Sequence, residues 1–323
     1  ISGSSVGLPG VDNGVFDDEN LERIMDGHSF ISQLPEAEVD RMVGQNIVRV
    51  KKDASGAGSF ETIANPSDAV HLVGRRGEFD LIRDYGVNPN VADAYDITTK
   101  LAVAAGLEAL RDAHIPLVRT WKTTSTGKKL PTGWALPESV GDETGIIFAC
   151  AFPGYDSLIA DLQSRADDPE AFRFDRKFLL KVLSMGHAQL AQLIGARGPN
   201  VSINTACAST TFGLSLAEDW IRAGRCKRVL VVGADDITNE QLSEWLVTGF
   251  LAAGAATTES DVTKAALPFD VRRHGMICGM GAVGVVVEHP DEVKARGVTP
   301  LAELIATEVA NSAFHATRLH LKH

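Results

Sequence analysis

Short apolar, β-branched runs alternate with longer amphipathic stretches along this chain of 323 residues. Apolar runs of strand length predict buried strands at 145–151, 201–204, 228–234 and 282–288. Apolar residues at helical spacing predict helices at 97–113, 172–195, 208–223 and 239–252. Because continuous apolar strands are typical of sheets that are covered on both faces, this alternation favours an α/β layered fold with helices on both sides of the sheet.

Two segments interrupt the alternation. Residues 30–95 are rich in predicted loops and poorly periodic, with Gly, Ser and Ala at 54–59. Residues 118–141 form a polar excursion with Thr, Ser, Gly, Lys and two prolines. We interpret 118–141 as an insertion rather than a domain linker, because core-like sequence resumes at Gly145.

Size, charge and cysteine content limit the class of protein. A chain of this length with 44% hydrophobic residues can bury a large core. Its net charge of −11 disfavours nucleic acid and anionic membranes as partners. No segment approaches the ~20 consecutive apolar residues that a membrane-spanning helix needs. Four cysteines without paired spacing indicate a reducing compartment, which predicts a cytoplasmic protein. The chain begins at Ile1 in strand-like sequence without a signal peptide, which is typical of part of a longer polypeptide.

Glycines at 279, 281 and 284 have the spacing of a glycine-rich loop. This spacing fits no dinucleotide-binding fingerprint, and a strand rather than a helix follows. We interpret the three glycines as positions of close backbone approach in a tight turn.

Cys207 stands at a predicted strand-to-helix turn, and this setting gives a thiol two chemical advantages. A strand at 199–204 runs into small residues, and the helix that follows can end at Gly224. The positive end of the helix favours the thiolate over the thiol. The free N–H groups of that helix end can hold the oxyanion that forms when sulfur attacks a carbonyl. The sequence therefore predicts Cys207 as a nucleophile that becomes acylated.

The other three cysteines lack this setting. Cys150 lies in the apolar run 145–151, and Cys226 lies in a helix-to-strand turn beside Lys227. Free cysteines are usually buried and behave as small hydrophobic residues, so we expect structural roles for Cys150, Cys226 and Cys278.

The sequence Thr205-Ala-Cys-Ala-Ser209 resembles the nucleophile motif of the β-ketoacyl synthases, the condensing enzymes of fatty-acid and polyketide assembly lines. Five further segments resemble that family in the expected order. They are the opening strand and loop at 1–10, the "DPQQR"-like segment and its helix at 87–113, the strand at 228–235, the "PFD…R.G…GEG"-like block at 268–281 and the "SDAFHIT"-like segment at 311–317. Together they resemble the elongating ketosynthase domain of a type I multidomain synthase. Thiolases and synthases that prime with acyl-CoA match less well, because they lack the block at 268–281.

The resemblance implies a thiolase-like layered αβαβα fold. Residues 1–290 then form the N-terminal ketosynthase half, with loop-rich insertions at about 30–95 and 118–141, and residues 298–323 form the truncated beginning of the C-terminal half. The implied reaction transfers an acyl chain from carrier-protein phosphopantetheine to Cys207. A decarboxylative Claisen condensation with a malonyl-type extender follows. No cofactor is expected to bind directly, because the carrier protein supplies the phosphopantetheine.

The two histidines that the family uses for decarboxylation do not occur in this sequence. The family carries them in motifs like "EAHGTGT" and "GH", and the sequence ends at His323 ahead of both. His315 and Thr317 match the preceding segment, which implies that they line the acyl cavity without acting as the decarboxylation base. His274 and Met280 replace an Asp and an acidic residue of the family pattern. These departures leave open a non-elongating ketosynthase-like module that binds or relays acyl chains and scaffolds a dimer.

The resemblance also implies partners: acyl and malonyl thioesters, an acyl carrier protein, neighbouring synthase domains and a second copy of this chain. A homodimer joined through the strand at 199–204 is expected, because an apolar edge strand needs cover. Carrier proteins are usually acidic, so docking needs a local basic patch on this acidic chain. The candidates, which are equally well explained as solvated surface charges, are Lys122, Lys128, Lys129, Arg222, Arg225, Lys227 and Arg228.

Overall fold

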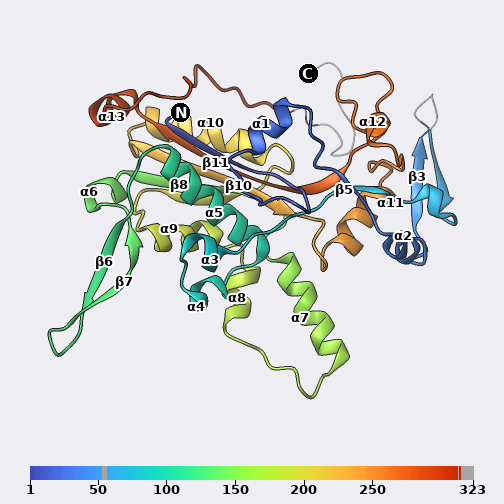
Figure 1. Ribbon diagram of the computed structural model, residues 1–323, viewed down its shortest axis with the longest axis horizontal. Helices are drawn as coiled ribbons and strands as arrows, with labels where there is room; N and C mark the ends of the chain where they lie inside the picture. The colour runs from blue at the N-terminus through green and yellow to red at the C-terminus, as the bar shows by residue number, and fades with distance from the viewer. Residues whose placement is uncertain (53–56, 312, 314–323) are drawn as a thin grey trace.

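A seven-stranded mixed sheet runs through the structure, a computed structural model that describes residues 1–52, 57–311 and 313 (Figure 1). Three of its strands are parallel to one another. β8 (Thr144–Ala149) lies between β9 (Asn200–Ile203) and β10 (Arg228–Asp236). The carboxyl ends of these three strands therefore meet at one edge of the sheet.

The other side of the sheet is largely antiparallel. β11 (Cys278–Glu288) pairs antiparallel with β10, and β1 (Gly3–Gly7) pairs antiparallel with β11. β5 (Leu72–Gly74) pairs parallel with the first residues of β11, and β2 (Ser32–Gln33) closes the row beside β5. Among the described strands, β9 is thus an edge strand of the sheet, and β2 is the opposite edge.

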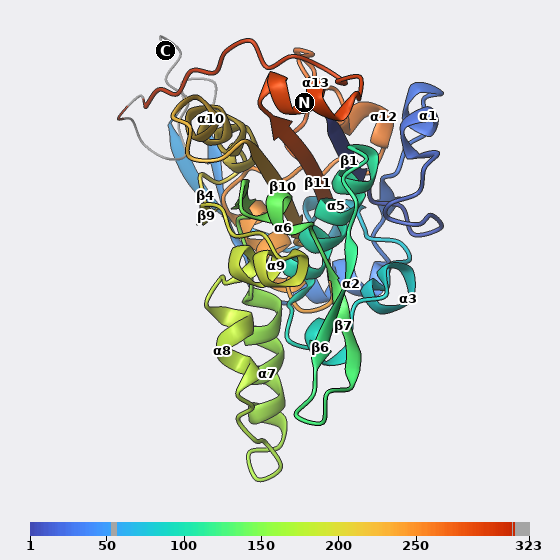
Figure 2. The ribbon, with the colours of Figure 1, turned by 90° about the vertical axis from the view of Figure 1, so that its left-hand side faces the viewer.

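Helices cover both faces of the sheet, which accounts for the apolar runs. α5 (Ile97–Asp112) packs on one face and α10 (Ser209–Arg222) on the other (Figure 2). Along β8, Ile146 and Phe148 face the core on the α5 side, whereas Ile147 faces the core on the α10 side. Because both faces are buried, successive residues of the strand are all apolar, as in parallel sheets generally.

The predicted strands are confirmed as β8, β9, β10 and β11, and the helices predicted at 97–113 and 208–223 are confirmed as α5 and α10. The helix predicted at 239–252 is only partly correct. It consists of a π-helical turn, Ser243–Val247, followed by α11 (Thr248–Ala252).

The single helix predicted at 172–195 is wrong. The segment contains α8 (Lys177–Val182) and α9 (Gly186–Ile194), which are separated at Ser184, where φ is +52°. A residue in this left-handed conformation cannot continue a right-handed helix. A Cβ on Gly186 would lie 2.3 Å from the ring of Phe148, so α9 begins with a glycine pressed against β8.

The two segments that interrupt the sequence pattern have their own structure. Residues 118–141 begin with an antiparallel hairpin of β6 (Val118–Thr123) and β7 (Lys129–Ala135) and end in α6 (Glu138–Gly141). The hairpin extends away from the sheet in Figure 1. Within 30–95, Val39, Ile47 and Val73 pack with Leu251 in a small second core. The sequence pattern does not indicate this core, because it is assembled from elements of only a few residues.

The remaining helices and strands are short apart from α7. They are α1 (Asn20–Met25), α2 (Glu36–Val43), β3 (Val48–Lys52), β4 (Gly58–Thr62), a 3₁₀ turn (Pro66–Asp68), α3 (Leu81–Tyr85), α4 (Pro89–Ala92), α7 (Tyr155–Asp167), α12 (Val262–Ala265) and α13 (Pro290–Arg296). Within the described ranges, none of the helices has both the length and the apolar character that crossing a membrane requires.

The three glycines of the 279–284 segment lie in strand β11, so the predicted tight turn is wrong. The predicted close approach holds for two of them. A Cβ on Gly284 would lie 2.3 Å from the carbonyl oxygen of Ala105 in α5, and one on Gly279 would lie 3.3 Å from Gly74 in β5. Gly281 has open space around it.

Arg228 is buried at the start of β10, so its candidacy for a carrier-docking patch is wrong. Its Nε donates to Glu288 Oε1 over 2.6 Å, and the second carboxylate oxygen of Glu288 accepts from Arg296 over 2.7 Å. The Arg228 side chain is 2% exposed and that of Glu288 is 0% exposed. The ion pair therefore belongs to the core. The other six candidates are exposed on the β6–β7 hairpin and around the end of α10.

The first and last described segments lie together. The amino group of Ile1 donates to the carbonyl oxygen of Ala302, and the carbonyl of Ile1 accepts from Leu301. Residues 298–311 then pass α10 without forming a helix or strand, and the Thr307 hydroxyl bonds Glu218 and Ser215. This segment is the described part of the expected C-terminal half at 298–323.

Candidate active site

Cys207 lies on a sharp turn between the edge strand β9 and helix α10. Its side chain is exposed, whereas Cys150, Cys226 and Cys278 are buried. Ala206 directly before it has φ of +52°, in the left-handed region, and α10 begins two residues later at Ser209. The turn thus places the sulfur at the carboxyl edge of the sheet, beside the first turn of a helix.

Hydrogen bonds fix the turn on both sides of Cys207. The Ala206 N–H donates to Asn204 Oδ1 over 2.9 Å. The Ser209 hydroxyl donates to the carbonyl of Ala206 over 2.6 Å and accepts from the Thr205 N–H over 2.9 Å. Within the part of the chain that the structure describes, the N–H of Cys207 itself has no acceptor. It can therefore donate to the oxyanion that forms on a carbonyl oxygen when the sulfur attacks the carbonyl carbon.

Two glycines let α10 begin close to the sheet. A Cβ on Gly213 would lie 2.9 Å from Val231 Cγ1, and one on Gly233 would lie 2.4 Å from Thr210 Oγ1. Larger residues at either position would push the helix away from β10. The position of Cys207 thus depends on small residues in both elements.

The loop after β8 lies beside this turn and is held by Asp235 at the end of β10. The two carboxylate oxygens of Asp235 accept from the N–H groups of Ala151 and Phe152, both over 2.8 Å. The carbonyl of Ala151 accepts from Asn204 Nδ2 over 3.0 Å. Burial raises the pKa of Asp235 to about 6, although the two N–H bonds favour the charged form. Asp96 and Asp236 nearby also raise it.

Burial gives the remaining cysteines a different chemical character. It raises the pKa of Cys150 and Cys226, and it raises the pKa of Cys278 to about 11. A thiol that stays protonated is a poor nucleophile. The structural roles expected for these three residues remain a prediction.

Of the other candidates from the sequence, the structure describes His274 and Met280. His315 and Thr317 lie outside the described residues. His274 is exposed, with its Nδ1 3.0 Å from the Thr257 hydroxyl, and Met280 is buried in β11. Sequence reasoning missed Asn204 and Asp235. An Asn directly after a strand is a signal for a side chain that bonds the backbone of a turn, whereas nothing near Asp235 in sequence indicates its partners.

A cavity of about 510 Å³ adjoins the turn along the edge strand. Residues 200–204, the loop after β8, Tyr155 and His187 line it. Burial lowers the pKa of His187. Asn204 itself lines the cavity, so this space adjoins the turn that carries Cys207.

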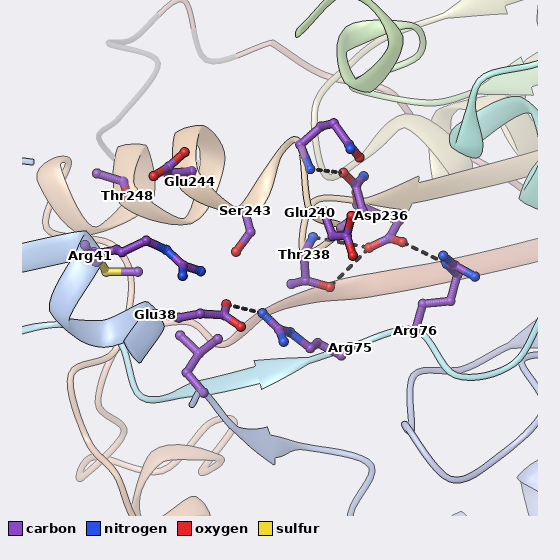
Figure 3. Close-up of a pocket in the computed structure, with 14 residues that line it drawn as sticks. Glu38, Arg41, Arg75, Arg76, Asp236, Thr238, Glu240, Ser243, Glu244 and Thr248 are labelled. Atoms are coloured by element: carbon purple, nitrogen blue, oxygen red, sulfur yellow. Dashed lines mark hydrogen bonds and ion pairs between the residues drawn. The ribbon is translucent and has the colours of Figure 1, made fainter. Parts of the chain in front are cut away.

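A larger cavity of about 860 Å³ lies at the end of β10 on the side away from β8 (Figure 3). Two ion pairs cross it: Arg75 with Glu38 of α2, and Arg76 with Asp236 over 3.1 Å. The Thr238 hydroxyl also donates to Asp236 over 3.1 Å. These contacts fasten the segment after β5 to the end of β10, and Cys207 does not line the cavity.

Metal chemistry has no candidate site in the described ranges, where no group of three or more His, Cys, Asp or Glu side chains converges.

Comparisons with known proteins identify the family of this chain. The family model described as "Beta-ketoacyl synthase, N-terminal domain" matches residues 1–292. The 3-oxoacyl-[acyl-carrier-protein] synthase 2 of Staphylococcus aureus is 26% identical over 269 residues, which cover 82% of this chain and 60% of the relative. The chloroplastic 3-oxoacyl-[acyl-carrier-protein] synthase II of Arabidopsis thaliana is 34% identical over 138 residues, covering 42% of this chain and 25% of that protein.

Among solved structures, a β-ketoacyl synthase from Burkholderia phymatum STM815 superposes with a TM-score of 0.57 at 17% sequence identity. The superposition covers 92% of this chain and 62% of that one, and it establishes a thiolase-like layered fold. The chain therefore spans about 60% of the length of the Staphylococcus relative and of the solved structure.

Proposed function

The chain belongs to the β-ketoacyl synthase family, whose N-terminal domain matches residues 1–292, and we propose that it is the nucleophile-bearing part of a ketosynthase. In this proposal an acyl chain moves from the phosphopantetheine of an acyl carrier protein to Cys207. The acyl chain then condenses with a malonyl-type extender. The synthase acts in the cytoplasm, within a type I multidomain chain and beside neighbouring synthase domains.

The position of Cys207 carries the proposal. An exposed sulfur at a strand-to-helix turn, beside an N–H without an acceptor among the described residues, suits attack on a thioester. The thiolate attacks the carbonyl carbon, the bond to the phosphopantetheine sulfur breaks, and the leaving thiolate takes up a proton. Loss of CO₂ from the extender then gives an enolate, whose carbon attacks the acyl carbonyl and releases Cys207 as thiolate.

The first half of this reaction is directly measurable. The full-length chain, incubated with an acyl-phosphopantetheine thioester, is expected to retain one acyl group per chain as a thioester, detectable by intact-mass measurement. Release of the acyl group by neutral hydroxylamine identifies the bond as a thioester. A chain that stays unmodified under these conditions would contradict the proposal.

The relatives named for an acyl carrier protein support that partner here. The exposed basic residues that remain as docking candidates are Lys122, Lys128, Lys129, Arg222, Arg225 and Lys227. No cofactor is proposed to bind the chain directly.

A second function retains support from Met280. This residue is 7% exposed in β11, where the family pattern has an acidic residue. A buried thioether cannot supply a carboxylate, so a module that binds or relays acyl chains and scaffolds a dimer remains the alternative. Formation of a carbon–carbon bond distinguishes the two functions.

We further propose a homodimer joined along β9. This strand pairs with β8 on one side only among the described strands, and its residues 201 and 203 are apolar. A free apolar strand edge is a template for pairing with another chain. Light scattering on the full-length chain is expected to give twice the chain mass, and a stable monomer at micromolar concentration would contradict this interface.

His315 and Thr317 are proposed to line the acyl cavity without serving as the decarboxylation base. The His315→Ala variant is then expected to change the acylation or condensation rate by about 10-fold or less, the effect of one lost contact. Acylation and malonyl decarboxylation are measured separately in the complete ketosynthase domain. Normal acylation with abolished decarboxylation would overturn this assignment and make His315 catalytic.

A further inference from the structure

The turn that carries Cys207 contains a backbone conformation that its own residues do not favour. Ala206 has φ of +52°, a region in which a Cβ crowds the backbone. Such a conformation persists only where surrounding contacts fix it, and it often occurs at reactive sites. The contacts that fix Ala206 therefore decide where the N–H and Sγ of Cys207 point.

Asn204 supplies one of these contacts, and it uses both ends of its side-chain amide. Its Oδ1 accepts from the Ala206 N–H over 2.9 Å, which closes the turn from within. Its Nδ2 donates to the carbonyl of Ala151 over 3.0 Å, which anchors the turn to the loop after β8. One side chain thus links the left-handed residue to the neighbouring strand.

Asp235 fixes that loop in turn. Its carboxylate accepts from the N–H groups of Ala151 and Phe152, both over 2.8 Å. The partners are 84 and 83 residues apart in sequence, so the bonds join the end of β10 to the end of β8. A continuous path of hydrogen bonds runs from Asp235 through the loop to Asn204 and Ala206, across three adjacent strands.

We propose that Asn204 and Asp235 are positioning residues for acyl transfer. They hold the turn so that the Sγ and the N–H of Cys207 both point toward the carbonyl group of the thioester substrate. Neither side chain reacts with the substrate in this scheme, although Asn204 also lines the cavity beside the turn. Both act through the backbone at Ala206. The inference rests on the proposed function, because it concerns the acylation of Cys207.

Two reactions of the same thiol separate positioning from general damage. Acylation by an acyl-pantetheine thioester passes through an oxyanion, which the Cys207 N–H is placed to stabilise. Alkylation by iodoacetamide forms a carbon–sulfur bond and expels iodide without any oxyanion. A change that misdirects the N–H therefore slows acylation much more than alkylation.

In the full-length chain, Asn204→Ala is expected to lower the rate constant for acylation of Cys207 by about 10- to 100-fold. The same variant is expected to change the alkylation rate constant by less than about 3-fold, because no oxyanion donor takes part. Asn204→Asp keeps the acceptor for the Ala206 N–H and loses the donor to Ala151. Its acylation rate constant is therefore expected to lie between those of Asn204→Ala and the unchanged protein. Asp235→Asn keeps one acceptor oxygen, so its acylation rate constant is also expected to be intermediate.

Asn90 in α4 offers a control, since it is exposed and its side chain makes no hydrogen bond with the described residues. Asn90→Ala is expected to leave both rate constants unchanged. If circular dichroism shows that Asn204→Ala does not fold, the Asn204→Asp and Asp235→Asn variants carry the same comparison.

The measured rate constants distinguish failure of the positioning roles from failure of the proposed function. Equal acylation rates in the variants and the unchanged protein, or an equal loss in both reactions, would overturn the positioning roles and leave the proposed function intact. A wild-type chain that iodoacetamide alkylates at Cys207 but that the thioester does not acylate would overturn the proposed function, and the inference with it.

Discussion

The Cys207→Ala variant is expected to form no covalent adduct with an acyl thioester or with an electrophile of the cerulenin type. Cys207 is the exposed cysteine, whereas Cys150, Cys226 and Cys278 are 1%, 3% and 5% exposed. Burial raises the pKa of all three buried thiols, which keeps them protonated and unreactive. Intact-mass measurement of the full-length chain before and after incubation gives the number of adducts.

Cys226→Ala is the matched control for this result. It removes a buried thiol beyond the other end of α10 and is expected to leave one adduct per chain. Undiminished adduct formation in Cys207→Ala would show that another residue reacts and would contradict the assignment of the nucleophile.

Glu288→Ala is expected to lower the free energy of unfolding by about 3–5 kcal/mol, the typical cost of breaking a buried pair by removing one partner. Arg228 is 2% exposed, and Glu288 is its carboxylate partner at 2.6 Å. Once Glu288 is removed, the guanidinium retains only the Thr144 hydroxyl at 3.3 Å among the described residues. Arg296 loses the same carboxylate. Denaturant titration followed by circular dichroism measures the change.

The nearby pair of Lys227 and Glu292 provides the control. It joins a half-exposed lysine to a partly exposed carboxylate over 3.5 Å. Solvent screens such a pair, so Glu292→Ala is expected to cost about 1 kcal/mol or less. Equal effects of Glu288→Ala and Glu292→Ala would contradict the core role of the Arg228–Glu288 pair.

The strands that the sequence predicts correctly are buried on both faces of the sheet. The apolar run at 228–234 becomes β10 because Leu230 and Val232 face one core while Val229 and Val231 face the other. A continuous apolar run is sufficient to predict such a strand, because a strand buried on both faces does not alternate apolar and polar residues.

Prediction fails where burial is weak. None of the residues of α7 is buried, so its sequence carries no clear core-facing stripe. The break at Ser184 depends on a left-handed residue and on the contact between Gly186 and Phe148, neither of which periodicity reveals.

At the candidate site, the nucleophile is predictable and the residues around it are not. Small residues between an apolar strand and an amphipathic helix indicate the Cys207 turn directly. The bonds of Asp235 to Ala151 and Phe152 join residues more than eighty positions apart, and the burial of Arg228 depends on Glu288, sixty positions away. Such partners become apparent only when the strands are placed side by side.

The proposed condensation is tested by identifying the reaction product. The complete ketosynthase domain that contains this chain is supplied with an acyl-carrier-protein thioester and a malonyl thioester, and the products are identified by mass spectrometry. A 3-ketoacyl thioester longer by two carbons is expected, with one CO₂ released per product. The Cys207→Ala variant is expected to give no product. An acyl group that is bound or transferred without a new carbon–carbon bond would contradict the ketosynthase assignment and support the non-elongating module.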